Sequence, residues 1–91
     1  MMATVRVPTV LRSHTGGAAV VEAEGVTLGA LLSDLGDRHP GITERILDDD
    51  GGLHRFVNVF VGDEDVRYLE GLDTPIPDGT EVSILPAVAG G

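Results

Sequence analysis

A single amphipathic helix constrains the fold of this 91-residue chain more than any other feature of its sequence. Four leucines recur at positions i, i+3, i+4 and i+7, namely Leu28, Leu31, Leu32 and Leu35. This spacing places all four on one face of a helix. Thr27 is a good N-cap residue, and His39-Pro40-Gly41 ends the helix because the residue before a proline avoids the α-helical region. A helix with one apolar face must bury that face against another layer.

The segment before this helix alternates in the way that β-strands do. Residues 4–11 are expected to form the first strand, in which Val10 and Leu11 continue the apolar run. Pro8 marks an irregularity there, because proline has no N–H to donate to a neighbouring strand. A glycine-containing turn follows, and residues 18–24 are expected to form the second strand. The two strands together predict a β-hairpin.

The strongest strand of the chain follows the helix, at residues 55–61. Alternation assigns its side chains to two faces, with Val57, Val59 and Val61 under the helix and Phe56, Asn58 and Phe60 on the open side. A tight turn at Gly62-Asp63 leads into a short strand near residues 66–68. The last strand is expected at residues 81–85, and Pro86 stops it.

The resulting order is β-β-α-β-β-β, with an additional helical turn expected at residues 42–47. This order predicts an α+β fold of two layers, in which one main helix packs on a mixed sheet of four to five strands. The length allows one domain, whose core is workable without metals or disulfides. We expect residues 1–86 to form this domain and residues 87–91 to form a flexible C-terminal tail.

Charge and hydropathy exclude several classes of protein. The formal net charge is −9, with fifteen acidic residues and six basic ones, all of them arginine. Nucleic-acid binding is not expected, because phosphate contacts require a basic face. The acidity serves either solubility or steering toward a basic partner surface. No apolar run approaches the roughly 18 residues that span a membrane, and residues 1–6 lack the apolar stretch of a signal peptide. We therefore expect a cytoplasmic protein with no membrane partner.

The side chains do not form a recognisable catalytic constellation. The sequence has neither a phosphate-binding loop nor a Rossmann glycine fingerprint. Its three histidines, His14, His39 and His54, are far apart in the sequence and lack metal-ligand spacing. It has no cysteine, so no side-chain thiol is available for nucleophilic, redox or metal chemistry. We expect a protein that is not an enzyme and has no cofactor or metal of its own.

The end of the main chain offers chemistry that the side chains do not. Small residues follow Pro86, namely Ala87, Val88, Ala89, Gly90 and Gly91, and such a segment can thread a narrow channel. Its terminal carboxylate, with an ordinary pKa of about 3.5, is ionised at neutral pH and is a poor electrophile. A partner would have to convert it to an acyl-adenylate with ATP. A sulfur donor could then displace the adenylate and leave a C-terminal thiocarboxylate.

Seven segments carry a resemblance to a known family. They are Val7-Pro8-Thr9, Leu11-Arg12, Thr15-Gly16-Gly17, Asp65-Val66-Arg67, Gly71-Leu72-Asp73-Thr74-Pro75, Asp78-Gly79 and the decapeptide from Val82 to Gly91. With these segments the chain resembles the ThiS/MoaD family of ubiquitin-like sulfur carriers over nearly its whole length. Its length and the long stretch 53–77 are most similar to the actinobacterial carriers that serve cysteine biosynthesis.

The resemblance implies a β-grasp fold, with the last strand beside the first in the sheet centre and the Gly-Gly tail protruding. It implies that Gly91, preceded by Gly90, is adenylated and thiocarboxylated by an ATP-dependent activating enzyme. It also implies a pyridoxal-phosphate-dependent cysteine synthase that accepts the sulfur, and a metal-dependent peptidase that releases the new cysteine. ATP and pyridoxal phosphate are expected on these partners.

Partner contacts are expected at the end of the last strand and on the open face of the sheet. The residues assigned to them are Phe60, Leu85, Pro86, Val88 and Ala89. Three alternatives stay open. The sulfur could serve molybdopterin, thiamine or another product, the chain could be a ubiquitin-like modifier conjugated through Gly91, or it could be an interaction module without terminal chemistry.

Overall fold

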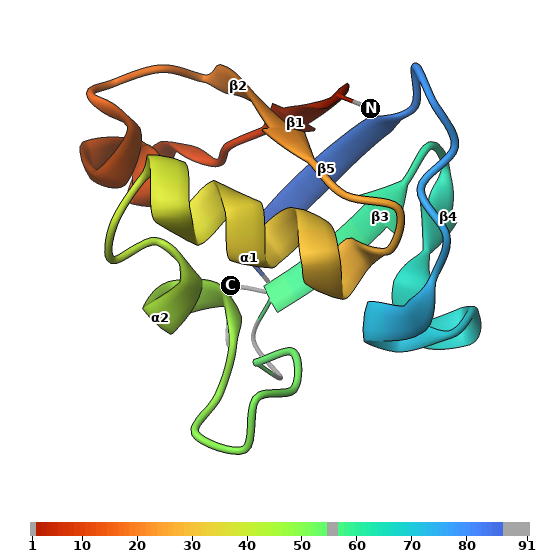
Figure 1. Ribbon diagram of the computed structural model, residues 1–91. Coiled ribbons are helices and arrows are strands. Elements are labelled where there is room, and N and C mark those ends of the chain that lie inside the picture. The colour runs from red at the N-terminus through yellow and green to blue at the C-terminus, as the bar shows by residue number, and fades with distance from the viewer. Residues whose placement is uncertain (1, 55–56, 87–91) are drawn as a thin grey trace.

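The computed structural model describes residues 2–54 and 57–86. Within them, five strands form one sheet in the order β2-β1-β5-β3-β4 (Figure 1). The strands are β1 (Met2–Arg6), β2 (Val20–Glu24), β3 (Val57–Val61), β4 (Glu64–Asp65) and β5 (Glu81–Pro86). The α-helices are α1 (Leu28–Arg38) and α2 (Thr43–Ile46), and the 3₁₀-helices are η1 (Thr9–Thr15), η2 (Val66–Tyr68) and η3 (Gly71–Asp73).

The sheet is mixed, and its central strand comes from the end of the chain. β5 runs parallel to β1 and antiparallel to β3, while β1 and β2 form the antiparallel hairpin that the sequence predicts. Strand β4 pairs with β3 across a two-residue turn. The α+β β-grasp architecture is therefore confirmed, with the last strand lying beside the first.

Helix α1 lies across one face of this sheet (Figure 1). Its N-cap is Thr27, whose hydroxyl accepts a hydrogen bond from the Ala30 N–H at 3.3 Å. The four leucines of the predicted apolar face are completely buried. They pack over inward-facing strand residues: Ala3, Val5, Val21, Ala23, Val57, Val59, Val82 and Ile84. The core therefore lies between one helix and one sheet face, as the periodicity of the sequence predicts.

The expectation that the first strand continues through Val10 and Leu11 is wrong. β1 ends at Arg6, and residues 9–15 form η1. Pro8 explains the change, because it has no N–H to extend the ladder after the Val7 N–H donates to Ala19 O at 2.7 Å. The helical turn buries Leu11, whereas Val10 stays 68% exposed.

The expectation of a short strand near residues 66–68 is also wrong, because the strand lies earlier in the chain and these residues form a 3₁₀-helix. The strand that follows the Gly62-Asp63 turn is β4, at Glu64–Asp65, and Val66–Tyr68 is η2. The Asp65 carboxylate explains where the strand stops, because it accepts the Arg67 backbone N–H at 2.9 Å and so caps a helical turn.

Gly25 joins β2 to α1 where no larger residue fits. A Cβ at this position would lie 2.6 Å from Leu31 Cα and 2.8 Å from Ala30 C, and would also contact the Leu31 nitrogen. All three neighbours are backbone atoms and cannot rotate away. We expect Gly25→Ala to lower the free energy of unfolding by about 2–3 kcal/mol, measured by urea denaturation.

Gly52→Ala is the matched control for this substitution. A Cβ at Gly52 would meet its nearest neighbour, Asp48 Oδ1, at 3.8 Å, which is an ordinary contact. Its effect should stay within about 0.5 kcal/mol. Equal effects of the two substitutions would contradict the close approach of α1 to Gly25.

Asp34 ties the middle of α1 to the edge strand β2. Its Oδ2 accepts the Glu24 backbone N–H at 2.7 Å and Arg38 Nε at 2.6 Å. The Glu24 N–H and, after it, the Arg38 guanidinium lower the pKa of the Asp34 carboxyl below its ordinary value. Because folding lowers this pKa, the carboxylate stabilises the fold at neutral pH, and this contribution is lost as the pH falls through about 3.9 and below.

We therefore expect Asp34→Asn to make the stability of the protein less dependent on pH in the acidic range. Urea midpoints measured from pH 7 down to pH 3 would show a shallower decline in this variant than in the native chain. Asp37→Asn, an exposed position on the same helix, is the control and should keep the native slope. An unchanged slope in Asp34→Asn would contradict the assignment.

Candidate functional site

The predicted site residues fall into two groups. Phe60 and Leu85 are fully described, and Pro86 is the last residue of β5. The glycines predicted to be reactive, Gly90 and Gly91, lie outside the described residues, as do Val88 and Ala89. The structure therefore defines the surface from which the last five residues start.

The central position of β5 fixes this starting point. On one side β5 pairs with β1 from Glu81 to Ser83, and on the other it pairs with β3 from Val82 to Pro86. The pair Val57–Pro86 is the last in the register. β5 is thus held on both sides up to Ser83 and by β3 alone up to Pro86, and the chain after Pro86 begins beside the first residue of β3.

Side chains alternate strictly along the two strands that reach this point. Val59 and Ile84 are buried under the helix, whereas Leu85 is 47% exposed on the opposite face. Phe60 is half-buried on that same open face. Leu85 lies directly opposite Asn58, and Phe60, two residues further along β3, is its diagonal neighbour. Leu85 and Phe60 thus form an apolar pair on the open face beside the end of β5.

Arg67 also belongs to this surface, although the alternation of residues along the strands does not predict it. Its Nη1 donates to Asn58 Oδ1 at 2.7 Å, and its Nη2 donates to the His54 carbonyl oxygen at 2.7 Å. The guanidinium therefore joins η2 to the beginning of β3, next to Leu85. The sequence contains the Asp65-Val66-Arg67 segment, but nothing local to it indicates that Arg67 reaches back to residues 54 and 58.

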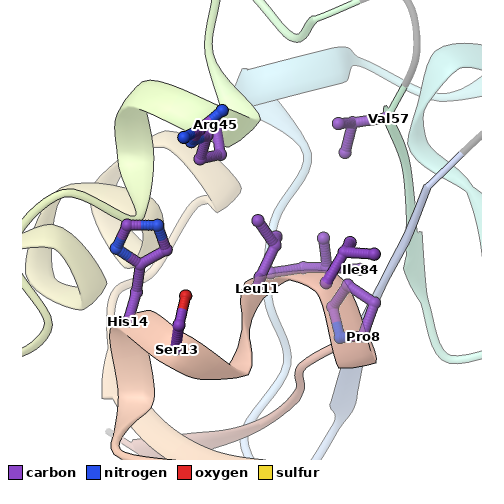
Figure 2. A pocket seen from close by; sticks show the side chains of 8 residues that line it. Pro8, Leu11, Ser13, His14, Arg45, Val57 and Ile84 are labelled. Atoms are coloured by element: carbon purple, nitrogen blue, oxygen red, sulfur yellow. The ribbon is translucent and has the colours of Figure 1, made fainter.

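A pocket of about 300 Å³ lies beside the start of β3 and the end of β5, on the face of the sheet that the helices cover (Figure 2). Its walls come from η1, α2 and the ends of β3 and β5. Arg45 and His14 lie on one side of it, and Val57 and Ile84 lie on the other (Figure 2). The complete lining is Pro8, Val10, Leu11, Ser13, His14, Arg45, Val57 and Ile84. A concave surface thus lies behind β5, while the apolar pair lies in front of it.

The described residues offer neither a metal site nor a membrane-spanning helix. Within residues 2–54 and 57–86, no group of three or more histidine, aspartate or glutamate side chains is arranged to hold a metal ion. No helix among these residues has the length and hydropathy to cross a bilayer. The features that distinguish this end of the molecule are therefore the apolar pair, Arg67 and the pocket.

Comparison with known proteins places this architecture in a family. The model of the ThiS family matches residues 5–91. The chain is 58% identical to the sulfur carrier protein CysO of Mycobacterium tuberculosis, over the full length of both. The crystal structure of M. tuberculosis CysO superimposes with a TM-score of 0.91 at 57% identity, covering 94% of this chain and 99% of that one.

Two further relatives extend the comparison. CysO in the crystal structure of the BexX/CysO complex of Amycolatopsis orientalis is 50% identical, with a TM-score of 0.92 and 98% of this chain and 99% of that chain covered. Small archaeal modifier protein 3 of Haloferax volcanii is 35% identical over 75% of this chain and 73% of its own. The chain belongs to the ThiS family and is a homologue of the mycobacterial sulfur carrier protein CysO.

Proposed function

We propose that this protein carries sulfur as a thiocarboxylate on its C-terminal residue, Gly91. The observation that carries the proposal is the full-length identity of 58% to a sulfur carrier protein, extending through the Gly-Gly terminus within the family match. The chain itself supports it. With no cysteine, the terminal carbonyl group is the place where this molecule can hold an exchangeable sulfur atom.

The chemistry requires an activating enzyme. A Gly91 carboxylate oxygen attacks the α-phosphorus of ATP, pyrophosphate leaves, and an acyl-adenylate forms. A sulfur nucleophile then attacks the carbonyl carbon and forms a C–S bond. The C–O bond to the adenylate breaks, and AMP leaves with its electron pair. Activation is needed because the free carboxylate is ionised and resists nucleophilic attack. Residues 87–91 act as the tail that reaches the active site, and residues 1–86 act as the domain that the enzyme holds.

The proposed contact surface is the open face at the end of β5. Leu85 and Phe60 supply apolar area, the guanidinium of Arg67 lies beside them, and the tail residues Val88 and Ala89 follow Pro86 into the partner. An exposed apolar pair flanked by an arginine has the composition of an interface centre. The crystal structure of the BexX/CysO complex of Amycolatopsis orientalis supports binding of this kind of chain to a protein partner.

Cysteine biosynthesis is the proposed destination of the sulfur, supported by the similarity to CysO. In this proposal a pyridoxal-phosphate-dependent synthase accepts the sulfur, and a metal-dependent peptidase releases the cysteine formed on Gly91. In this proposal the partner enzymes bind the ATP and the pyridoxal phosphate. Molybdopterin, thiamine and other sulfur-containing products remain the alternatives.

A second candidate function is protein modification through Gly91. The similarity to small archaeal modifier protein 3 favours it. The chain has no lysine, so it could not form lysine-linked chains with itself, but it could be attached to lysines of other proteins.

Intact-mass spectrometry of the protein from its native cell separates these functions. A sulfur carrier should show replacement of one terminal oxygen atom by sulfur after incubation with its activating enzyme, ATP and a sulfide donor. Denaturation-resistant adducts of higher mass would instead support the modifier. A terminal carboxylate that stays unchanged with enzyme, ATP and a sulfide donor would contradict the sulfur carrier, and the absence of adducts from the native cell would contradict the modifier.

A further inference from the structure

The pocket between η1 and α2 contains an arginine that has no partner within the described part of the chain. Arg45 is exposed and makes no ion pair or side-chain hydrogen bond with these residues. The other described arginines do have partners: Arg6 with Glu81, Arg12 with the Val7 carbonyl, Arg38 with Asp34, and Arg67 with Asn58. An exposed guanidinium beside a pocket, without a partner among the described residues, is available to pair with a carboxylate supplied from outside.

The rest of the pocket is mixed, because its lining combines apolar side chains with the polar Ser13 and His14. Leu11 and Ile84 are buried, while Val10 at the rim is 68% exposed. Covering the exposed Val10 side chain with an apolar group of a partner would gain free energy. Figure 2 shows that the charged and apolar sides face each other across the cavity, so one occupant could satisfy both.

The position of the pocket relates it to the tail. Ile84 faces the pocket, and its neighbour Leu85 faces the open side of the sheet. Val57, which also lines the pocket, pairs with Pro86. A protein that surrounds the tail just beyond Pro86 must therefore approach both the apolar pair in front of β5 and the pocket behind it.

We propose that this pocket receives a loop from the mouth of the activating enzyme's tail channel, and that the loop places an apolar side chain against Val10 and Leu11 and a carboxylate on Arg45. This proposal rests on the proposed sulfur-carrier function. It adds a second anchor to the open-face contact, so that β5 is held on both sides when the carboxylate of Gly91 enters the active site. Charge complementarity favours an acidic loop, because a basic loop would bring like charge against Arg45.

The experiment uses two pairs of variants matched in exposure or in charge change. Arg45→Glu is paired with Arg38→Glu, which makes the same charge change at an exposed position on α1. Val10→Asp is paired with Val26→Asp, because these valines are 68% and 67% exposed. The readout is the rate of thiocarboxylate formation by the activating enzyme with ATP and a sulfide donor, as a function of carrier concentration and salt. Thermal melts of all four variants verify folding.

We expect Arg45→Glu and Val10→Asp to raise the KM for the carrier by about tenfold with little change in kcat, because a contact remote from the reacting atoms contributes uniform binding. Arg38→Glu and Val26→Asp should stay within about twofold of the native chain. The defect of Arg45→Glu should shrink at high salt, as expected for a charge at the rim of an interface.

Equal losses in the test and control variants, or native kinetics in Arg45→Glu and Val10→Asp, would overturn the pocket proposal. Those results would leave the sulfur-carrier function standing, because the native chain would still be loaded. Failure of the native chain to acquire sulfur would instead contradict the proposed function itself. Faster loading of Arg45→Glu would also overturn the proposal, since it would show that a basic loop or the chain's own terminal carboxylate meets Arg45.

Discussion

Deletion of Gly91 is expected to abolish thiocarboxylate formation while leaving the fold intact. The shortened chain still ends in a carboxylate, but that carboxylate lies one residue, or about 3.5 Å, short of its position in the activating enzyme. A displacement of about 1 Å can cost a hundredfold in rate, so we expect a loss of at least that size. Loading would be measured by intact mass after incubation with enzyme, ATP and a sulfide donor.

The structural half of this prediction follows from the sheet. The last pairing of β5 is between Pro86 and Val57, five residues before the end of the chain. The free energy of unfolding should therefore change by less than about 0.5 kcal/mol when Gly91 is removed. Gly91→Ala serves as a second variant, since it keeps the length of the chain and adds one methyl group. Normal loading of the shortened chain would contradict the assignment of the reactive group.

Substitution of neighbouring residues on β5 by aspartate should give opposite results. Leu85 is 47% exposed on the open face, so Leu85→Asp should alter the free energy of unfolding by less than about 1 kcal/mol. The same change removes apolar area from the centre of the proposed interface and should weaken binding of the activating enzyme by about 2 kcal/mol, or some thirtyfold. Isothermal titration calorimetry would measure this loss.

Ile84→Asp should instead prevent folding. Ile84 is 1% exposed in the core, and a carboxylate there would be desolvated without a partner. The cost of several kcal/mol is comparable to the total stability of a domain of this size. Circular dichroism would show the loss of structure directly.

Strand β3 provides an independent repeat of the same comparison. Phe60→Asp should weaken binding more than it weakens the fold, because Phe60 is half-buried on the open face. Val59→Asp should unfold the chain, because Val59 is completely buried. Binding that is insensitive to both Leu85→Asp and Phe60→Asp would show that partners do not use the open face.

The elements with clear periodicity could be predicted without the structure. The leucine spacing identifies the buried face of α1, and alternation along residues 57–61 separates Val59 from Phe60 correctly. These predictions succeed because a helix repeats every 3.6 residues and a strand every two, so burial on one side leaves a local pattern.

The segments where the prediction fails have a different cause. Residues 9–15 and 66–68 contain apolar residues that alternation alone assigns to strands, yet both form 3₁₀-helices. Their conformation depends on single polar details, namely the missing N–H of Pro8 and the cap supplied by Asp65. A short apolar run does not distinguish a strand from a buried turn, because it is too brief to show a period.

The sequence by itself determined the helix face, the inward residues of β3, the absence of cysteine and lysine side chains, and the small residues after Pro86. Each of these is a local or covalent property, and local properties can be read in one dimension. Only the tertiary structure decided that Arg67 joins the beginning of β3 and that η1 and α2 enclose a pocket behind β5. Such contacts join residues far apart in the chain, and their geometry exists only after the sheet has brought those residues together.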